Sequence, residues 1–185
     1  MILPIYVYGN PVLRTLSKDI TPDYPKLKEL VANLWETLYE SDGVGLAAPQ
    51  VGLNIRLFVV DGTPMDEDDP KCAGFKKVFI NARILERSGE KWLFNEGCLS
   101  LPTIREDVPR EAKIKIQYQD ENFETHIDEF DGLRARIVQH EYDHLDAKLF
   151  IDHINPLRKR LMKKKLENIE RGNVDVSYKI KIKRK

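Results

Sequence analysis

The sequence predicts an α+β domain in which antiparallel β-sheets surround one central helix. Residues 112–119 alternate apolar and polar side chains, as a half-buried strand does, and a turn at 120–122 leads into a second strand at 123–130. The helical patterns are separate segments near the start of the chain, near the start of its last third and near its end. Helices that are segregated from antiparallel strands are typical of α+β domains.

The first helix is predicted between residues 24 and 41. Its apolar residues fall three or four positions apart and make one stripe, as in an amphipathic helix packed on a core: Leu27, Leu30, Val31, Leu34 and Leu38. Gly43 stands where a residue in the left-handed conformation would end this helix. The small-residue segment 43–52 that follows lacks the Lys and Ser/Thr of a phosphate-binding loop, so nucleotide binding is not indicated.

Strands are predicted next at 56–60, 78–80 and 83–85, followed by a turn at 88–90 and a returning strand at 92–94. Residues 61–71 are acidic and rich in turn-forming residues, and we expect a solvated loop because contiguous acids do not have the spacing of a calcium loop. Cys72, at the edge of that loop, is interpreted as an ordinary free thiol.

The central helix follows Asp131, which we expect to be its N-cap, and carries two histidines four residues apart. On a helix, His140 and His144 share one face, so both imidazoles can reach one ion. Glu141 directly follows the first histidine, which places it beside whatever such an ion holds. The alternative is two core or surface histidines that match the pattern by chance. The pattern favours metal binding but does not name a reaction.

Length and composition are those of one globular domain. With 185 residues, of which 42% are hydrophobic and 32% charged, the chain is large enough for one core and short for two. It has no apolar run of membrane-spanning length, its start lacks signal-peptide features, and two cysteines cannot build a disulfide framework. We therefore expect a cytoplasmic protein with neither a membrane nor DNA as its partner.

The C-terminal segment is strongly basic, although the formal net charge of the chain is zero. Residues 156–185 hold twelve Lys and Arg against three Asp and Glu, so this segment carries +9 and the remainder −9. A basic helix is predicted at 156–171, followed by a short edge strand with alternating Tyr178, Ile180 and Ile182. The charge favours a polyanionic neighbour, with a solvated helix face and a charged tail as the alternative.

A third metal ligand is needed because two histidines leave a tetrahedral ion short of donors. Cys98 offers a thiol between Gly97 and Leu99. One Cys and two His, with water in the fourth position, make a catalytic arrangement because one position stays exchangeable. His126 and His153 have no matching spacing, and we expect both to be structural or exposed.

Three segments together resemble the motifs of the peptide deformylase family, in their order along the chain: 43–50 (GVGLAAPQ), 96–100 (EGCLS) and 139–145 (QHEYDHL). The resemblance covers about residues 1–165 and implies one catalytic domain there. Residues 166–185 would be the end of the basic helix and a tail packed on the same domain. The implied activity is that of a metal-dependent hydrolase, which removes the N-formyl group from the N-terminal formyl-methionine of newly synthesised proteins and releases formate.

The resemblance also implies residue roles. The implied ligands of one divalent metal are Cys98, His140 and His144. Glu141 would be the acid/base residue, and the Gln50 amide and the Leu99 backbone N–H would donate hydrogen bonds to the oxyanion. Gly45 and Arg105 correspond to positions that contact the bound peptide.

Residues near the motifs are candidates for the methionine pocket and its support. Val44, Leu133 and Ile137 are predicted to line the pocket, with plain core packing as the alternative for Ile137. Asp143 either orients a ligand histidine or faces solvent. Ala147 stands where a glycine often ends the helix, which predicts an alanine in the left-handed conformation.

The donor set and the family bear on the cofactor and the partners. A thiolate ligand favours Fe²⁺, Zn²⁺, Ni²⁺ or Co²⁺ over Mg²⁺, and the family implies Fe²⁺ as the physiological ion. The implied partners are N-formylmethionyl nascent polypeptides, with ribosome docking through residues 156–185 as a further hypothesis. A zinc endopeptidase is one alternative, although such enzymes usually take their third ligand downstream. A structural metal domain that binds RNA is another, although the sequence supplies no fourth ligand.

Overall fold

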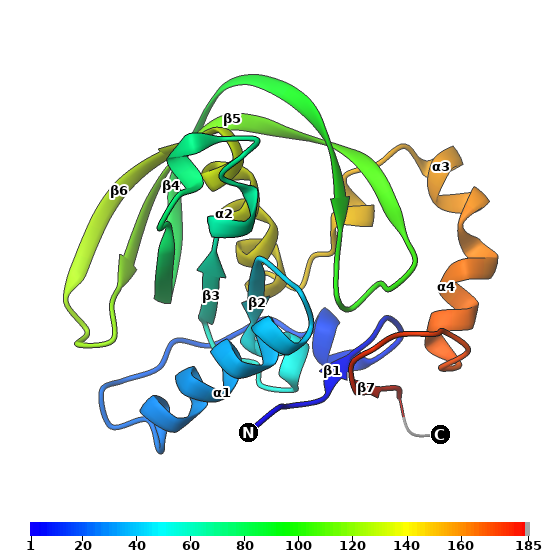
Figure 1. The fold of residues 1–185 in the computed structure, drawn as a ribbon, viewed down its shortest axis with the longest axis horizontal. Coiled ribbons are helices and arrows are strands. Elements are labelled where there is room, and N and C mark those ends of the chain that lie inside the picture. The colour runs from blue at the N-terminus through cyan, green and yellow to red at the C-terminus, as the bar shows by residue number, and fades with distance from the viewer. Residues whose placement is uncertain (184–185) are drawn as a thin grey trace.

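A five-stranded antiparallel sheet forms the body of the fold, in a computed structural model that describes residues 1–183 (Figure 1). Its strand order is β2-β3-β4-β5-β6. The bounds are Gly45–Ala47 for β2, Leu57–Asp61 for β3, Lys76–Gly97 for β4, Arg105–Gln119 for β5 and Thr125–Asp131 for β6. The predicted α+β class and antiparallel pairing are therefore confirmed.

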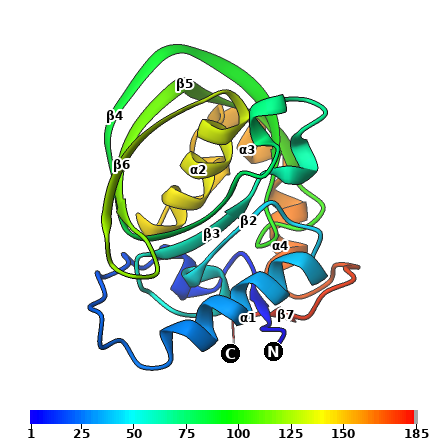
Figure 2. The same cartoon turned by 60° about the vertical axis from the view of Figure 1, so that its left-hand side comes forward.

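Helix α2 (Gly132–Leu145) lies inside the curve of this sheet. Figure 2 shows it enclosed by β4, β5 and β6 on one side and by β2 and β3 on the other. Its apolar residues Ala135, Ile137 and Val138 share a core cluster with aromatic residues of the strands, including Phe58 and Phe79. Because strands surround α2, side chains from several strands can meet it at one point.

Helix α1 (Leu27–Glu40) packs its predicted apolar stripe on a second core cluster, in which Val31, Leu34 and Leu38 are buried. The expected left-handed residue is Asp42 (φ 52°) and not Gly43, so that prediction was wrong. Position 43 has a glycine because there is no room for a Cβ, and not because its backbone is left-handed. A Cβ on Gly43 would lie 2.8 Å from Leu38 Cδ1 and 3.1 Å from Leu99 Cδ1.

Strand β4 corrects the predicted turn at 88–90. The chain does not reverse there, and both halves of β4 pair with β5, for example Arg87 with Ile114 and Trp92 with Arg110. Gly89 (φ 78°) lies where the register shifts, so its left-handed conformation serves a β-bulge. Strands β4 and β5 form one long curved hairpin, and its connection, residues 98–104, carries Cys98.

The C-terminal segment contains two short helices instead of the single predicted one. Helices α3 (Pro156–Leu161) and α4 (Lys163–Glu170) meet at Met162, whose side chain is buried in a third core cluster. The predicted late strand is β7 (Ile180–Lys181), which pairs in parallel with β1 (Ile5–Tyr6). Arg184 and Lys185, part of the predicted basic segment, lie outside the described residues.

Short 3₁₀ helices complete the fold at Pro11–Arg14, Ala48–Val51, Thr63–Met65, Pro70–Cys72 and Phe150–Asp152. Ala147 adopts the predicted left-handed conformation (φ 59°) at the end of α2. Across residues 1–183, no helix combines the length and apolar character needed to cross a bilayer.

Candidate metal centre and active site

Three side chains with metal-ligating atoms converge near the connection that joins β4 to β5. His140 and His144 project from adjacent turns of α2, and Cys98 begins the connection after β4. The ligand atoms of the three residues all lie within 4.8 Å of one another, and Cys98 Sγ is 3.4 Å from His144 Nε2. One thiolate and two imidazoles at this spacing can hold a single divalent ion.

Glu96 orients the first histidine. Its Oε1 atom lies 2.8 Å from His140 Nδ1, which leaves His140 Nε2 for an ion. The buried carboxylate also accepts hydrogen bonds from Arg110 and Arg136. Burial alone would raise the pKa of Glu96, but the hydrogen bonds from His140 and Arg110 outweigh it and hold the pKa well below its usual range. No role was predicted for Glu96 from the sequence, although it lies within the 96–100 motif.

Asp143 has neither of the two predicted positions. It is buried, and its Oδ2 atom accepts from Arg110 Nη1 at 2.7 Å and lies 2.7 Å from His153 Nε2. Burial would raise the pKa of Asp143, but His153 and Arg110 hold it at about 2. A chain of polar contacts thus runs from His140 through the buried side chains of Glu96, Arg110 and Asp143 to His153, which is partly exposed. It fixes α2 against β4 and β5.

Glu141 lies beside the three ligand-type residues and is only 4% exposed. Its Oε2 atom has no hydrogen-bond partner among residues 1–183, and the same holds for Nδ1 of His144. Burial raises the pKa of Glu141 to about 7, because the charged form is poorly solvated there. Burial and the neighbouring His140 lower the pKa of His144 to about 3, so His144 is a neutral donor.

A carboxylate oxygen that is buried and unpartnered needs a polar group that the protein itself does not supply. Glu141 presents such an oxygen next to Cys98, His140 and His144. An ion with an exchangeable water would satisfy it, so the residues present fit a catalytic metal.

Gly45 makes room for Glu141. A Cβ at this position would lie 2.5 Å from Glu141 Oε1 and 2.6 Å from its Cγ. Gly45 has no left-handed backbone, so close approach is the reason for a glycine here.

Gln50 and Leu99 each carry a hydrogen-bond donor at this site. Gln50 Oε1 accepts from Ala47 N at 2.9 Å, which directs Nε2 toward Ser100 Oγ (3.2 Å) and Cys98 Sγ (3.5 Å). The Leu99 N–H donates to no protein atom within the described chain. Both residues line the cavity at the candidate centre.

That cavity has a volume of about 540 Å³ and draws its walls from the loop before β2, from β4, from the 98–104 connection and from α2. Val44 and Ile137, predicted to line the methionine pocket, and Gly45 and Arg105, which the resemblance implied as peptide contacts, are among its lining residues. Leu133 does not. It is buried one turn before Ile137, near the start of α2, outside the lining residues.

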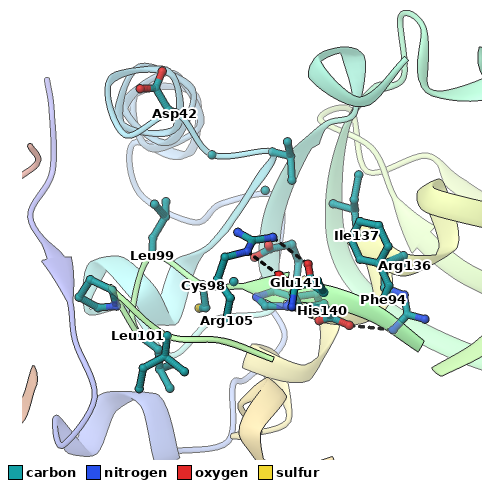
Figure 3. A pocket seen from close by; sticks show the side chains of 18 of the residues that line it. Asp42, Phe94, Cys98, Leu99, Leu101, Arg105, Arg136, Ile137, His140 and Glu141 are labelled. Atoms are coloured by element: carbon teal, nitrogen blue, oxygen red, sulfur yellow. Dashed lines mark hydrogen bonds and ion pairs between the residues drawn. The ribbon is translucent and has the colours of Figure 1, made fainter. Parts of the chain in front are cut away.

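Several lining residues were not anticipated. Phe94 and Leu101 flank Cys98 in the sequence, and Met65 comes from the acidic segment. Figure 3 shows Phe94, Ile137 and Arg136 on one side of the site and Leu99 and Leu101 on the other. Phe94 lies two residues before Glu96 on β4, so both side chains are on the same face of the strand. This spacing is the signal that could have identified Phe94.

The acidic segment also supports α2, contrary to the prediction of a solvated loop. Asp69 Oδ2 accepts the Leu133 N–H at 3.1 Å, so Asp69 performs the capping role expected of Asp131. The Asp131 carboxylate instead pairs with Lys71 (2.6 Å) and Arg134 (3.0 Å).

Arg105 spans the rim of the cavity. Its guanidinium donates to the Oδ1 atom (2.9 Å) and the carbonyl oxygen (2.7 Å) of Asn95. A Cβ on Gly97 would lie 2.6 Å from Arg105 Nη1, so this arrangement depends on a glycine at position 97.

Comparisons with known proteins agree with this geometry. The sequence model of the family described as "Polypeptide deformylase" matches residues 2–160. Peptide deformylases of Flavobacterium johnsoniae and Christiangramia forsetii are 54% and 52% identical, each over 98% of this chain and 96% of the relative.

Solved structures give the same result. Peptide deformylase 1B of Arabidopsis thaliana, in complex with an inhibitor, superposes with a TM-score of 0.81 at 35% identity, over 92% of both chains. Peptide deformylase from Thermotoga maritima superposes with a TM-score of 0.76 at 40% identity, over 84% of this chain and 99% of that one. This chain therefore belongs to the polypeptide deformylase family of hydrolases.

Proposed function

We propose that this enzyme removes the formyl group from N-formylmethionyl peptides and releases formate, with Cys98, His140 and His144 holding one divalent ion. The observation that carries the proposal is the unpartnered oxygen of buried Glu141, beside three converging ligand atoms and next to a cavity. A protein that used this cluster only for stability would have no reason to leave that oxygen open.

The donor set suits a soft to borderline ion, with Fe²⁺ as the physiological choice and Zn²⁺, Ni²⁺ or Co²⁺ as substitutes. When bound, such an ion lowers the pKa of a water molecule and polarises a carbonyl oxygen. Glu96 holds the His140 ring in the orientation that this requires.

The remaining chemistry belongs to side chains and backbone of this chain. Glu141 accepts a proton from the attacking water as a C–O bond forms at the formyl carbon. Gln50 Nε2 and the Leu99 N–H donate to the formyl oxygen as its charge develops. Glu141 then gives the proton to the departing amine, the C–N bond breaks, and formate and a free N-terminus result.

In this proposal, the methionine side chain of the substrate binds in the cavity. Val44 and Ile137 supply apolar wall, and Gly45 and Arg105, which also line the cavity, are the proposed contacts of the peptide backbone. Leu133 lies outside the cavity and has no part in this proposal. Ile137→Trp places a larger side chain in the cavity and leaves less room for the methionine side chain. The substitution is expected to raise KM for formyl-methionyl peptides more than it lowers kcat.

The function is tested with protein purified anaerobically with Fe²⁺ or Ni²⁺ and a formyl-methionyl tripeptide. We expect formate release from the parent and a rate lower by about 10²–10⁴-fold in Glu141→Gln, which keeps the shape but loses the proton acceptor. Glu90→Gln, at an exposed position of β4 that does not line the cavity, is the matched control and should retain full rate.

Other outcomes would overturn the proposal. Cleavage of internal peptide bonds would identify an endopeptidase. Absence of formate release, with about one tightly held ion per chain, would identify a structural metal site.

We also propose that α3 and α4 dock the enzyme on ribosomal RNA, where formylated chains emerge. The support is the exposed basic surface that includes Arg160, Lys163, Lys164 and Lys165. Truncation at residue 156 is unsuitable as a test, because it would also remove the core residues Leu166 and Ile169.

Substitution of surface charge tests docking without damage to the core. Lys164→Glu with Lys165→Glu should abolish salt-sensitive cosedimentation with ribosomes, since phosphate contacts weaken steeply with salt. Lys26→Glu with Lys28→Glu, on exposed positions of the α1 region, is the control with the same change of charge. Equal cosedimentation of both variants would refute docking through α4.

A further inference from the structure

The chain beyond α4 returns to the active site. Strand β7 pairs with β1, and Ile5 N–H donates to Lys179 O at 2.8 Å and Val7 N–H to Lys181 O at 3.2 Å. Figure 1 shows β1 and β7 side by side, below the loop that joins β4 and β5. This C-terminal strand lies beyond residues 2–160, where the family match falls.

Tyr178, just before β7, reaches the residue that follows the thiol ligand. Its hydroxyl donates a hydrogen bond to the carbonyl oxygen of Leu99 at 2.8 Å. Tyr178 and Leu99 are both half-buried and pack against the second core cluster. Burial and the neighbouring Cys98 raise the pKa of Tyr178 to about 12, so the phenol stays a donor over the range in which enzymes work.

Separate contacts hold the neighbours of Leu99. The Ser100 carbonyl accepts the Tyr8 N–H at 2.8 Å, and the Leu101 N–H donates to Cys98 O at 2.9 Å. In residues 1–183, Tyr178 is the one donor to the carbonyl of Leu99 itself. The Leu99 N–H donates to no protein atom among the described residues, and Leu99 lines the cavity.

We propose that Tyr178 is a positioning residue, whose hydrogen bond to the Leu99 carbonyl holds the Leu99 N–H in place to receive the developing oxyanion. The proposal rests on the deformylase function proposed above. A preorganised donor stabilises developing charge without a cost of reorganisation at the moment of reaction. A donor that is free to rotate loses that advantage, although it still binds the substrate in its ground state.

Tyr178→Phe tests this, because it removes only the hydroxyl. The control is Tyr118→Phe, since the Tyr118 hydroxyl also donates to one acceptor, Asp128 at 2.7 Å, and Tyr118 does not line the cavity. The Tyr118 hydroxyl accepts a further hydrogen bond from Lys77 Nζ at 3.2 Å. Tyr178→Phe loses one hydrogen bond and Tyr118→Phe loses two, so the Tm of the control should fall at least as far, by a few degrees.

Kinetics and spectra should separate the two variants. Tyr178→Phe is expected to lower kcat by about tenfold with KM within about twofold, a smaller loss than removal of the oxyanion donor itself, which costs about 10²–10³-fold. In the Zn²⁺-loaded protein, the amide ¹⁵N and ¹H resonances of Leu99 and Ser100 should shift in Tyr178→Phe and stay in place in Tyr118→Phe.

Three results would overturn the proposal: unchanged kcat in Tyr178→Phe, unshifted Leu99 and Ser100 resonances, or an equal loss of kcat in Tyr118→Phe. If the parent enzyme releases no formate, the proposed function fails instead. The amide resonances then still decide whether the Tyr178 hydroxyl fixes Leu99.

Discussion

Gly45→Ala tests whether the position of Glu141 controls the reaction. The added Cβ would lie 2.5 to 2.7 Å from the Glu141 carboxyl and Cγ atoms, whereas ordinary contact begins at 3.4 Å. The carboxylate must therefore withdraw by about 0.7 to 0.9 Å, because the β2 backbone at Gly45 is paired with Val60 and cannot easily move. A misplacement of about 1 Å can cost about 100-fold in rate, which equals about 2.7 kcal/mol in the activation barrier.

The assay is formate release by the metal-loaded enzyme, with metal content measured on the same sample. We expect kcat to fall by about 100-fold while one ion per chain is retained, because the alanine meets Glu141 and not a ligand atom. Gly62→Ala is the control, since its Cβ would lie at 3.3 to 3.5 Å from Phe75 and Cys72 and does not meet Glu141. Gly45→Ala with kcat within about threefold of the parent would refute this reasoning.

Three further predictions concern the residues that support the site. Glu96→Gln leaves two buried arginines without their shared carboxylate and should reduce the free energy of unfolding by about 3–5 kcal/mol and metal affinity by about 10–100-fold, measured by urea unfolding and metal titration. Asp69→Ala removes the cap of α2 and should cost about 1 kcal/mol in urea unfolding, more than Asp131→Ala costs. Burial opposes ionisation of Asp152, but Arg14 holds its pKa at about 2, below the ordinary 3.8. The stability it contributes is therefore complete above about pH 4 and is lost as the pH falls toward 2, and Asp152→Asn should remove that part of the acid dependence of Tm.

Each of these has a contrary outcome. Full metal affinity in Glu96→Gln would show that the His140 ring needs no carboxylate partner. A larger loss in Asp131→Ala than in Asp69→Ala would return the capping role to Asp131. An unchanged profile of Tm between pH 4 and 2 in Asp152→Asn would exclude this ion pair from the acid response.

Patterns of short range were predictable from the sequence. The stripe of α1, the alternation at 112–119 and the hairpin into β6 depend on the periods of helix and strand, which neighbouring residues determine. The spacing of His140 and His144 belongs to the same class, since helical geometry alone puts them on one face. The predicted turn at 88–90 was wrong because a glycine is compatible with more than one local structure. Gly89 suits a turn or a bulge, and the pairing of β4 with β5 decided for the bulge.

The partners of these residues come from distant parts of the chain. Glu96 contacts His140 from 44 positions away, Asp69 caps a helix that begins 63 positions later, and Tyr178 reaches Leu99 across 79 positions. Propensity carries no information on such pairs, because they form only when strands and helices have packed.

By itself, the sequence determined the family, the candidate ligand residues and the helix that carries two of them, because these depend on residue identity and local spacing. Only the tertiary structure decided that Leu133 lies outside the cavity, that Met65 and Phe94 line it, and that Asp143 belongs to a buried chain with Arg110. The physical reason is that the burial of a side chain and its hydrogen-bond partners depend on the groups that surround it in space. The sequence order does not state which groups those are.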